Sequence, residues 1–217
     1  MTLDVVRLAP ADGPPLAAGG FSRWLSRMSR ALSSDGASDV PCGDCTACCE
    51  GSYFIHVTPD DAGARRRIPA AVLFPAPGAG PGHRVMGYDE RGRCPMLSGG
   101  RCTIYADRPR TCRTYDCRIF AATGLAEPGP AKAAIMARAA RWHFDYADES
   151  DRQRHQALRT AAWSVVASAD TLADVLPRNA TQLAMLLVRH HTLLLAADFG
   201  RDGDESMARL RRALSAH

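Results

Sequence analysis

The cysteines constrain this chain more than any other feature of its sequence. All eight lie between Cys42 and Cys117, in two groups separated by a stretch without cysteine. The first group reads CGDCTACC and the second is more widely spaced. The eight members are Cys42, Cys45, Cys48, Cys49, Cys94, Cys102, Cys112 and Cys117. Whatever chemistry the chain performs, we expect this segment to take part in it.

The compartment decides what clustered cysteines do. The first twenty residues lack the basic and then apolar pattern of a secretory signal. No apolar run reaches the ~20 residues needed to cross a bilayer. We therefore expect a cytoplasmic protein without a membrane span. Because disulfides rarely persist in the cytoplasm, clustered cysteines there more often bind metal or do redox chemistry.

The spacing of the first group is that of a metal site. A gap of two residues lets two thiolates turn back onto one centre, as in zinc knuckles and iron–sulfur proteins. Four thiolates suit both zinc and an iron–sulfur cluster. The CxxCxxC core and the Pro95 that follows Cys94 favour an iron–sulfur cluster or iron, and zinc is the alternative. The cysteines have no histidine or carboxylate next to them that would indicate an open catalytic zinc site. We expect His56 to be structural.

The division of the ligands can also be predicted. Adjacent residues tend to direct their side chains apart, so we expect Cys48 and Cys49 to serve different centres. Cys42 and Cys45 would then share a centre with Cys48 and one distal cysteine. Several arginines crowd the second group and either donate hydrogen bonds to sulfur or are simply solvated: Arg93, Arg101, Arg108, Arg110, Arg113 and Arg118.

Composition narrows the class of protein. The 217 residues carry a net charge of +4, and 26 of the 27 basic residues are arginine. In an alanine-rich chain, this preference for arginine over lysine reflects the base composition of the genome. Because the excess of positive charge is small, we do not expect a nucleic-acid partner. Protein partners and oligomeric state cannot be read from the sequence.

The hydrophobic pattern predicts the organisation of the chain. Residues 1–40 should form a tail or adapting strand followed by an amphipathic helix that begins at Phe21. Residues 41–122 should form the cysteine-cluster domain, with a Gly- and Pro-rich loop from Leu73 to Tyr88. After a linker at 124–130, residues 131–217 should be helical, with Ile135, Ala139, Trp142 and Tyr146 on one stripe. The predicted fold class is α+β or mainly α.

The two cysteine groups together resemble a known family. CxxCxxCC, a further cysteine, C-x-I-Y-x-x-R-P-x-x-C-R and a final cysteine form the signature of the YkgJ-type cysteine-cluster family, which is described as zinc- or iron-chelating. Besides the cysteines, its members here are Ile104, Tyr105, Arg108, Pro109 and Arg113. The same motif occurs in the larger flagellin lysine methylases of bacteria. The resemblance covers residues 41–120 and implies metal chelation by the cysteines.

The sequence thus predicts a protein that chelates zinc or iron, or an iron–sulfur cluster, through eight cysteines. Two alternatives stay open. One is a zinc-stabilised protein-interaction module, since structural zinc can supply folding free energy. The other is a protein-modifying enzyme, by analogy with the flagellin methylases. No catalytic residue can be named, and whether the chain is an enzyme is left undecided.

Overall fold

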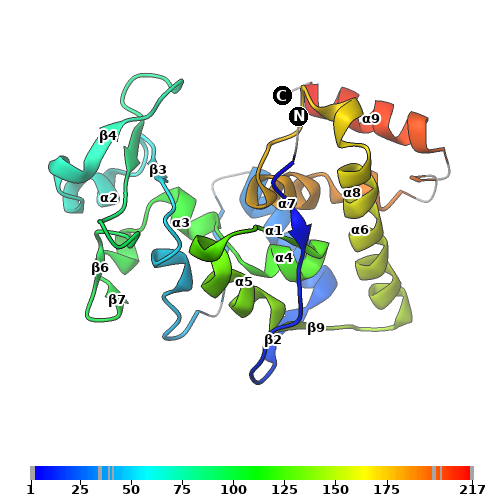
Figure 1. Cartoon of the computed structure of the whole chain (residues 1–217), viewed down its shortest axis with the longest axis horizontal. Coiled ribbons are helices and arrows are strands. Elements are labelled where there is room, and N and C mark those ends of the chain that lie inside the picture. Colours follow the sequence, from blue (N-terminus) through cyan, green and yellow to red (C-terminus); the bar gives the residue numbers. More distant parts are fainter. Residues whose placement is uncertain are drawn as a thin grey trace. The chain divides into compact units, whose positions relative to one another are not determined.

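The computed structural model describes residues 3–33, 36–38, 40, 42–196, 199–200 and 202–215. Pro41, where the predicted cysteine domain begins, and His217, where the helical region ends, lie outside these residues. The chain divides into two compact units (Figure 1). The helical unit comprises residues 1–34, 117–128 and 136–217, and the cysteine unit comprises 35–116 and 129–135.

Two small sheets bring distant parts of the sequence together in the helical unit. Strand β1 (Val6–Arg7) pairs antiparallel with β8 (Leu125–Ala126). Strand β2 (Leu16–Gly20) runs parallel to β9 (Trp142–Asp145), with Leu16 opposite Trp142 and an irregularity between Ala17 and Gly19. The N-terminal segment is therefore fixed by pairing with residues more than a hundred positions away.

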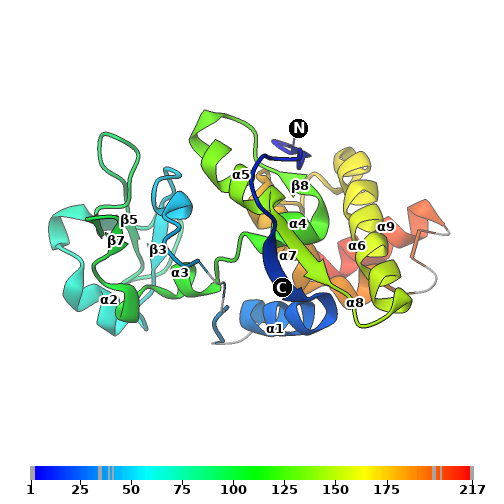
Figure 2. The same ribbon diagram turned by 90° about the horizontal axis from the view of Figure 1, so that it is seen from below.

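The helices of this unit form its core. Helix α1 (Phe21–Ser33) buries Trp24, Leu25 and Met28, on the stripe that the sequence predicted, and contacts α6 (Glu149–Ala167) and α7 (Ala180–Arg189). Helix α4 (Arg118–Thr123) packs on α6 and α7 (Figure 2). Asp148 and Asn179 cap the N-termini of α6 and α7 through their side chains. The remaining elements are η5 (Ala169–Leu172), α8 (His191–Leu194) and α9 (Gly203–Ser215).

The prediction of one helical stripe from Ile135 to Tyr146 was wrong. Helix α5 (Ala133–Ala140) ends before Trp142, and the chain continues as β9. Trp142 and Phe144 are buried while His143 and Asp145 are exposed. This alternation has the period of a strand, and pairing with β2 selects it over the helix.

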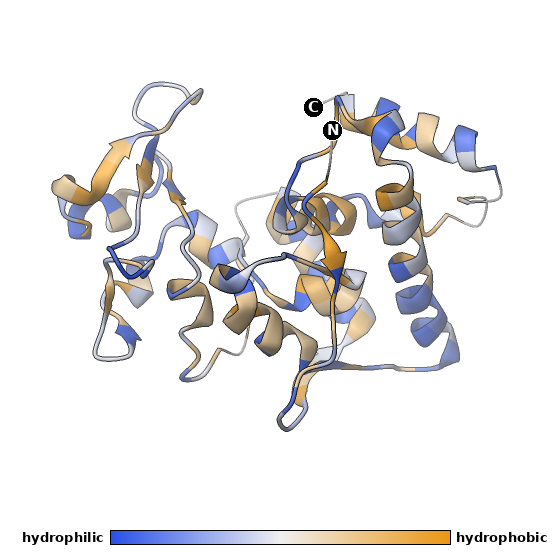
Figure 3. Ribbon diagram, in the orientation of Figure 1, coloured by the Kyte–Doolittle hydropathy of each residue, from blue (hydrophilic) through white to orange (hydrophobic). Residues whose placement is uncertain are grey.

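The cysteine unit is built round a three-stranded antiparallel sheet in the order β3-β5-β4, which comprises β3 (Ile55–Val57), β5 (Arg84–Met86) and β4 (Leu73–Pro75). A second hairpin joins β6 (Leu97–Ser98) to β7 (Arg101–Cys102). The apolar residues of these strands are orange in Figure 3, and Val57 and Met86 belong to the core of the unit. The predicted loop from Leu73 to Tyr88 thus contains two strands, which leaves only residues 76–83 as their connection.

Short helices complete the cysteine unit: η1 (Ala47–Cys49), α2 (Ala62–Arg67), η2 (Ala70–Val72), η3 (Tyr105–Asp107), α3 (Arg110–Thr114) and η4 (Pro130–Lys132). The mixture of helices and strands confirms the predicted fold class, α+β or mainly α. The division of the chain differs from the predicted domains, because the N-terminal segment and residues 117–128 group with the C-terminal helices. No helix among the described residues is long and apolar enough to cross a membrane.

Candidate metal centre

The first cysteine group is held by two tight turns. Gly43 adopts a φ of 57°, which is favourable for glycine, and the Cys45 N–H donates to the Cys42 carbonyl at 3.0 Å. The chain then enters η1, where the Cys49 N–H donates to the Thr46 carbonyl at 2.8 Å. These turns fold back the segment of eight residues that carries the first four thiols, as the spacing predicted.

Cys48 and Cys49 lie together in the 3-10 turn η1. The side chain of Cys49, followed by burial, raises the pKa of Cys48. The expectation that these two cysteines serve different centres stays a prediction.

Backbone pairing joins the second group to the first. The Cys94 N–H donates to the Cys49 carbonyl at 2.6 Å, and the Ser52 N–H donates to the Gly92 carbonyl at 3.0 Å. Cys94 and Cys102 also pack against the apolar core that includes Met96. The hairpin that bears Cys102 is thus anchored on one side by this core and on the other by the chain that follows Cys49.

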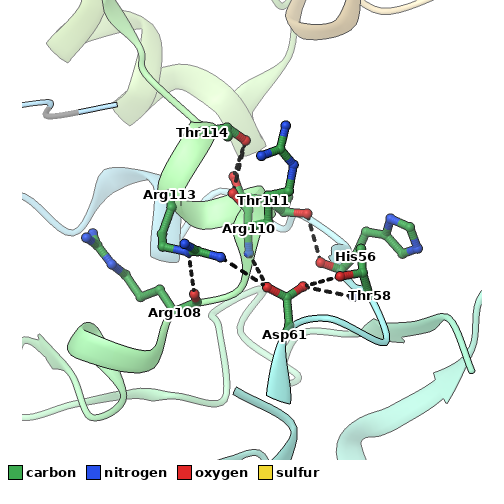
Figure 4. A network of polar contacts seen from close by, with 8 residues as sticks. All are labelled: His56, Thr58, Asp61, Arg108, Arg110, Thr111, Arg113 and Thr114. Atoms are coloured by element: carbon green, nitrogen blue, oxygen red, sulfur yellow. Dashed lines mark hydrogen bonds and ion pairs between the residues drawn. The ribbon is translucent and has the colours of Figure 1, made fainter. Parts of the chain in front are cut away.

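Cys112 is positioned by a buried carboxylate. It lies in α3, and Asp61, at the start of α2, accepts the Arg110 N–H at 2.7 Å through Oδ1. The other oxygen, Oδ2, accepts from the backbone N–H and the hydroxyl of Thr58 at 2.8 and 3.0 Å. Arg113 adds an ion pair to Oδ1 at 3.5 Å (Figure 4). Asp61 is only 5% exposed, so these contacts replace its hydration and tie α3 to the start of α2.

A second hydrogen bond supports α3 from the sheet. The Thr111 hydroxyl donates to the backbone carbonyl of His56 at 2.8 Å (Figure 4). The imidazole of His56 points elsewhere: its Nε2 lies 2.9 Å from Nδ1 of His83, and the two rings are stacked. His56 thus contributes its backbone to the positioning of α3 and its ring to a histidine pair.

The thiols influence one another's ionisation. Burial raises the pKa of Cys42 to about 11, with further contributions from Cys48 and Cys45. Burial raises the pKa of Cys112 to about 12, with contributions from Cys48, Cys94 and Cys102. The pKa of Cys94 is also raised, first by burial and then by Cys102 and Cys48. Thiolates in such surroundings are costly unless a cation neutralises them.

These influences connect seven cysteines into one group, which we call the thiol cluster. Cys48 is its central member, because it acts on thiols of both cysteine groups. The cluster comprises Cys42, Cys45, Cys48, Cys49, Cys94, Cys102 and Cys112. Among the described residues, no three His, Cys, Asp or Glu side chains are already arranged to hold a metal ion. A metal would therefore have to draw the gathered sulfurs closer.

Arg108 is the arginine whose charge reaches the thiol cluster. It lowers the pKa of Cys42, Cys48 and Cys112, against the larger effects that raise them. Its guanidinium lies over the ring of Tyr105, at 3.6 Å from the centroid. Its Nε is buried and has no hydrogen-bond partner within the described part of the chain. A buried donor without an acceptor fits a site where thiolates bound to a metal would supply one.

The other arginines have different roles. Arg93 pairs with Asp89, and Arg113 pairs with Asp61. Arg118 is buried in the helical unit, where it donates to the Ala18 carbonyl at 3.0 Å. Arg101 is exposed on β7. Of these arginines, Arg108 is placed to stabilise thiolates, whereas Arg93, Arg113 and Arg118 have partners within the fold.

Asp116 was missed by the sequence reasoning, which found no carboxylate at the cysteines. This residue is fully buried, accepts from the Ser38 hydroxyl at 2.6 Å and raises the pKa of Cys42 by its charge. In the sequence, the one signal that could have identified Asp116 is that it directly precedes Cys117. The carboxylate enlarges the set of groups that a metal could meet near Cys42.

Cys117 belongs to the helical unit. It precedes α4, and its sulfur accepts a hydrogen bond from the indole N–H of Trp142 at 3.1 Å. This places the final cysteine of the motif in a different unit from the thiol cluster. None of the eight cysteines forms a disulfide.

The comparison with protein families agrees with the donor set. Residues 41–129, less than half of the chain, match the family model CxxCxxCC, described as a putative zinc- or iron-chelating domain. The match agrees with the resemblance of the two cysteine groups to a zinc- or iron-chelating family. No curated protein and no solved structure matches the chain.

Proposed function

We propose that the chain binds a thiolate-ligated metal centre, an iron–sulfur cluster or iron in preference to zinc, through its cysteines. The observation that carries this proposal is the thiol cluster, in which cysteines of both sequence groups gather in one unit. Thiolate is a soft ligand that suits iron–sulfur clusters and zinc. A bound centre would keep the thiols deprotonated and remove the mutual repulsion that raises their pKa values.

The proposal assigns different tasks to the residues. Thiols of the cluster would ligate the metal. Arg108 would donate to sulfur and offset the net negative charge of a four-thiolate site. Asp61 would act through the backbone by holding α3, and so Cys112, in place. The preference for iron rests on the CxxCxxC core and on Pro95.

Metal analysis of the full chain tests this proposal. The protein is purified without oxygen, and iron, zinc and acid-labile sulfide are measured in the wild type and in Cys112→Ser. Thr46→Ser, in the same segment, is the matched control. We expect Cys112→Ser to lose metal and Thr46→Ser to retain it. Equal metal content in all three proteins, or metal-free wild type that stays folded, would overturn the proposal.

An interaction module is the second candidate, and exposed aromatic side chains favour it. Phe54 and Tyr88, with ring centroids 5.0 Å apart, are 65% and 42% exposed, and Phe74 is 55% exposed. A Cβ at Gly87 would lie within 4 Å of both phenylalanine rings, so Phe54 and Phe74 approach the same point of the surface. Such a group is typical of protein-binding surfaces. A redox-silent zinc centre, together with loss of partner binding in Phe54→Ser, would favour this role.

A further inference from the structure

The helical unit contains a pocket of about 790 Å³, within the range of small-molecule sites. Its walls come mainly from residues 8–10 before β2, the strand β9 with Tyr146, and one face of α6, and Ala121 and Ala140 add to them. The residues from α6 are Arg152, His155 and Arg159, which recur at helical spacing and so share that face. None of them belongs to the thiol cluster.

One side of the pocket is cationic. Arg159 is exposed and has no hydrogen bond or ion pair with any residue that the structure describes. Arg152 forms an exposed ion pair with Glu149, at 3.3 Å, which water screens. Asp145 also lines the pocket and offsets part of this charge. With His155 neutral, the lining carries two guanidinium groups against one carboxylate.

A hydrogen-bonded chain holds this side in place. Nε2 of His155 donates to the Ala121 carbonyl at 3.2 Å, so Nδ1 accepts from the Tyr146 hydroxyl at 2.8 Å. The His155 ring is stacked on Phe21, and burial, with Arg159 adding to it, lowers the pKa of this histidine. Arg152 lies over the Tyr146 ring at 4.6 Å. His155 and Tyr146 are therefore held in place before a ligand binds, and Arg152 lies against the Tyr146 ring.

Glycine makes room for Arg159. Gly124 ends α4 with a φ of 71°, and a Cβ there would lie 3.3 Å from the guanidinium of Arg159. The lining of the pocket also includes the apolar residues Leu8, Pro10 and Trp142. The indole N–H of Trp142 is already used by Cys117, so its ring offers the pocket only carbon surface.

We propose that this pocket binds a small organic carboxylate with a flat apolar body. Arg152 and Arg159 each carry a planar guanidinium group, and such a group can bind both oxygens of a carboxylate through two parallel N–H···O bonds. The apolar wall covers the body of the ligand and gives preference over inorganic anions. The single excess positive charge of the lining favours a monoanion over a doubly charged phosphate ester.

Calorimetric titration of the full chain tests this assignment, with benzoate as the probe. Benzyl alcohol, inorganic phosphate and phenyl phosphate are titrated in parallel, and Arg159→Gln and Arg154→Gln are compared with the wild type. Arg154 lies on α6 but does not line the pocket. We expect benzoate to bind more tightly than the other three probes. Arg159→Gln should weaken it about tenfold or more, and Arg154→Gln less than about twofold.

The assignment is overturned if benzoate does not bind, if benzyl alcohol or either phosphate binds as tightly, or if both variants lose affinity equally. Should Arg159→Gln fail to fold, the comparison of the four probes with the wild type decides alone. The binding measurement does not depend on metal, so its failure leaves the proposal for the thiol cluster standing.

Discussion

Replacing Asp61 by asparagine should loosen the cysteine unit without changing its shape. The carboxylate accepts from Thr58 twice and from Arg110 once, and it pairs with Arg113. An amide keeps one acceptor oxygen and turns the other position into a donor. Whichever way it is oriented, one buried backbone N–H, of Thr58 or Arg110, then faces an N–H instead of an oxygen.

The expected loss of stability follows from the hydrogen bonds that Asp61→Asn removes. An unsatisfied buried donor costs about 1–3 kcal/mol, and a hydrogen bond to a charged group is worth about 1.5–3 kcal/mol. The half-exposed pair with Arg113 adds at most about 1 kcal/mol. Because these contributions overlap, we expect Asp61→Asn to lower the free energy of unfolding by about 2–4 kcal/mol. Since α3 bears Cys112, metal affinity should fall in parallel.

The neighbouring Asp60 is the matched control. It has the same charge and is exposed, so Asp60→Asn should change the free energy of unfolding by about 0.5 kcal/mol or less. Urea unfolding of the metal-loaded proteins measures stability, and competition with a chromophoric chelator measures zinc affinity. If both variants behave like the wild type in both assays, the role of Asp61 in positioning Cys112 is refuted.

Three further predictions concern charge and protonation. Arg108→Met should weaken metal binding about tenfold by chelator competition, whereas the same change at exposed Arg101 should not; equal effects would contradict a specific role. Because the pKa values of Cys42 and Cys112 are raised to about 11 and 12, ligating thiols must release protons. Metal affinity should therefore rise with pH between 6 and 8, by about one logarithmic unit per pH unit and ligating thiol, and calorimetry in buffers of different ionisation enthalpy should detect the protons; a pH-independent affinity would argue against thiol ligands. Burial lowers the pKa of His155 below its usual 6.5, so the unfolded chain binds the proton more tightly. Unfolding free energy should fall as pH drops below about 6.5, and urea titrations of His155→Gln should show a weaker pH dependence in this range; an unchanged dependence would assign the effect to other groups.

The sequence could predict features that depend on local spacing. The helical repeat from Phe21 to Met28 is strong enough to identify α1, and the two-residue gaps between Cys42, Cys45 and Cys48 identify turns. Both patterns depend only on residues that lie a few positions apart in the sequence. The α+β class also follows from the mixture of periodicities along the chain.

Features that depend on distant partners could not be predicted. The four residues of β9 are too few to separate a strand from a helix, and their partner β2 lies far away in the sequence. Asp61 resembles an ordinary acidic residue at a helix start, and only the fold shows that it reaches Arg110, 49 positions later.

One measurement tests the central claim most directly: the metal and sulfide content of the full chain, purified without oxygen, together with its visible absorption before and after reduction. We predict iron with acid-labile sulfide and an absorption that bleaches on reduction. Zinc without sulfide would keep the metal centre but contradict the preference for iron. A folded protein without metal, in which all eight thiols react freely, would contradict the account itself.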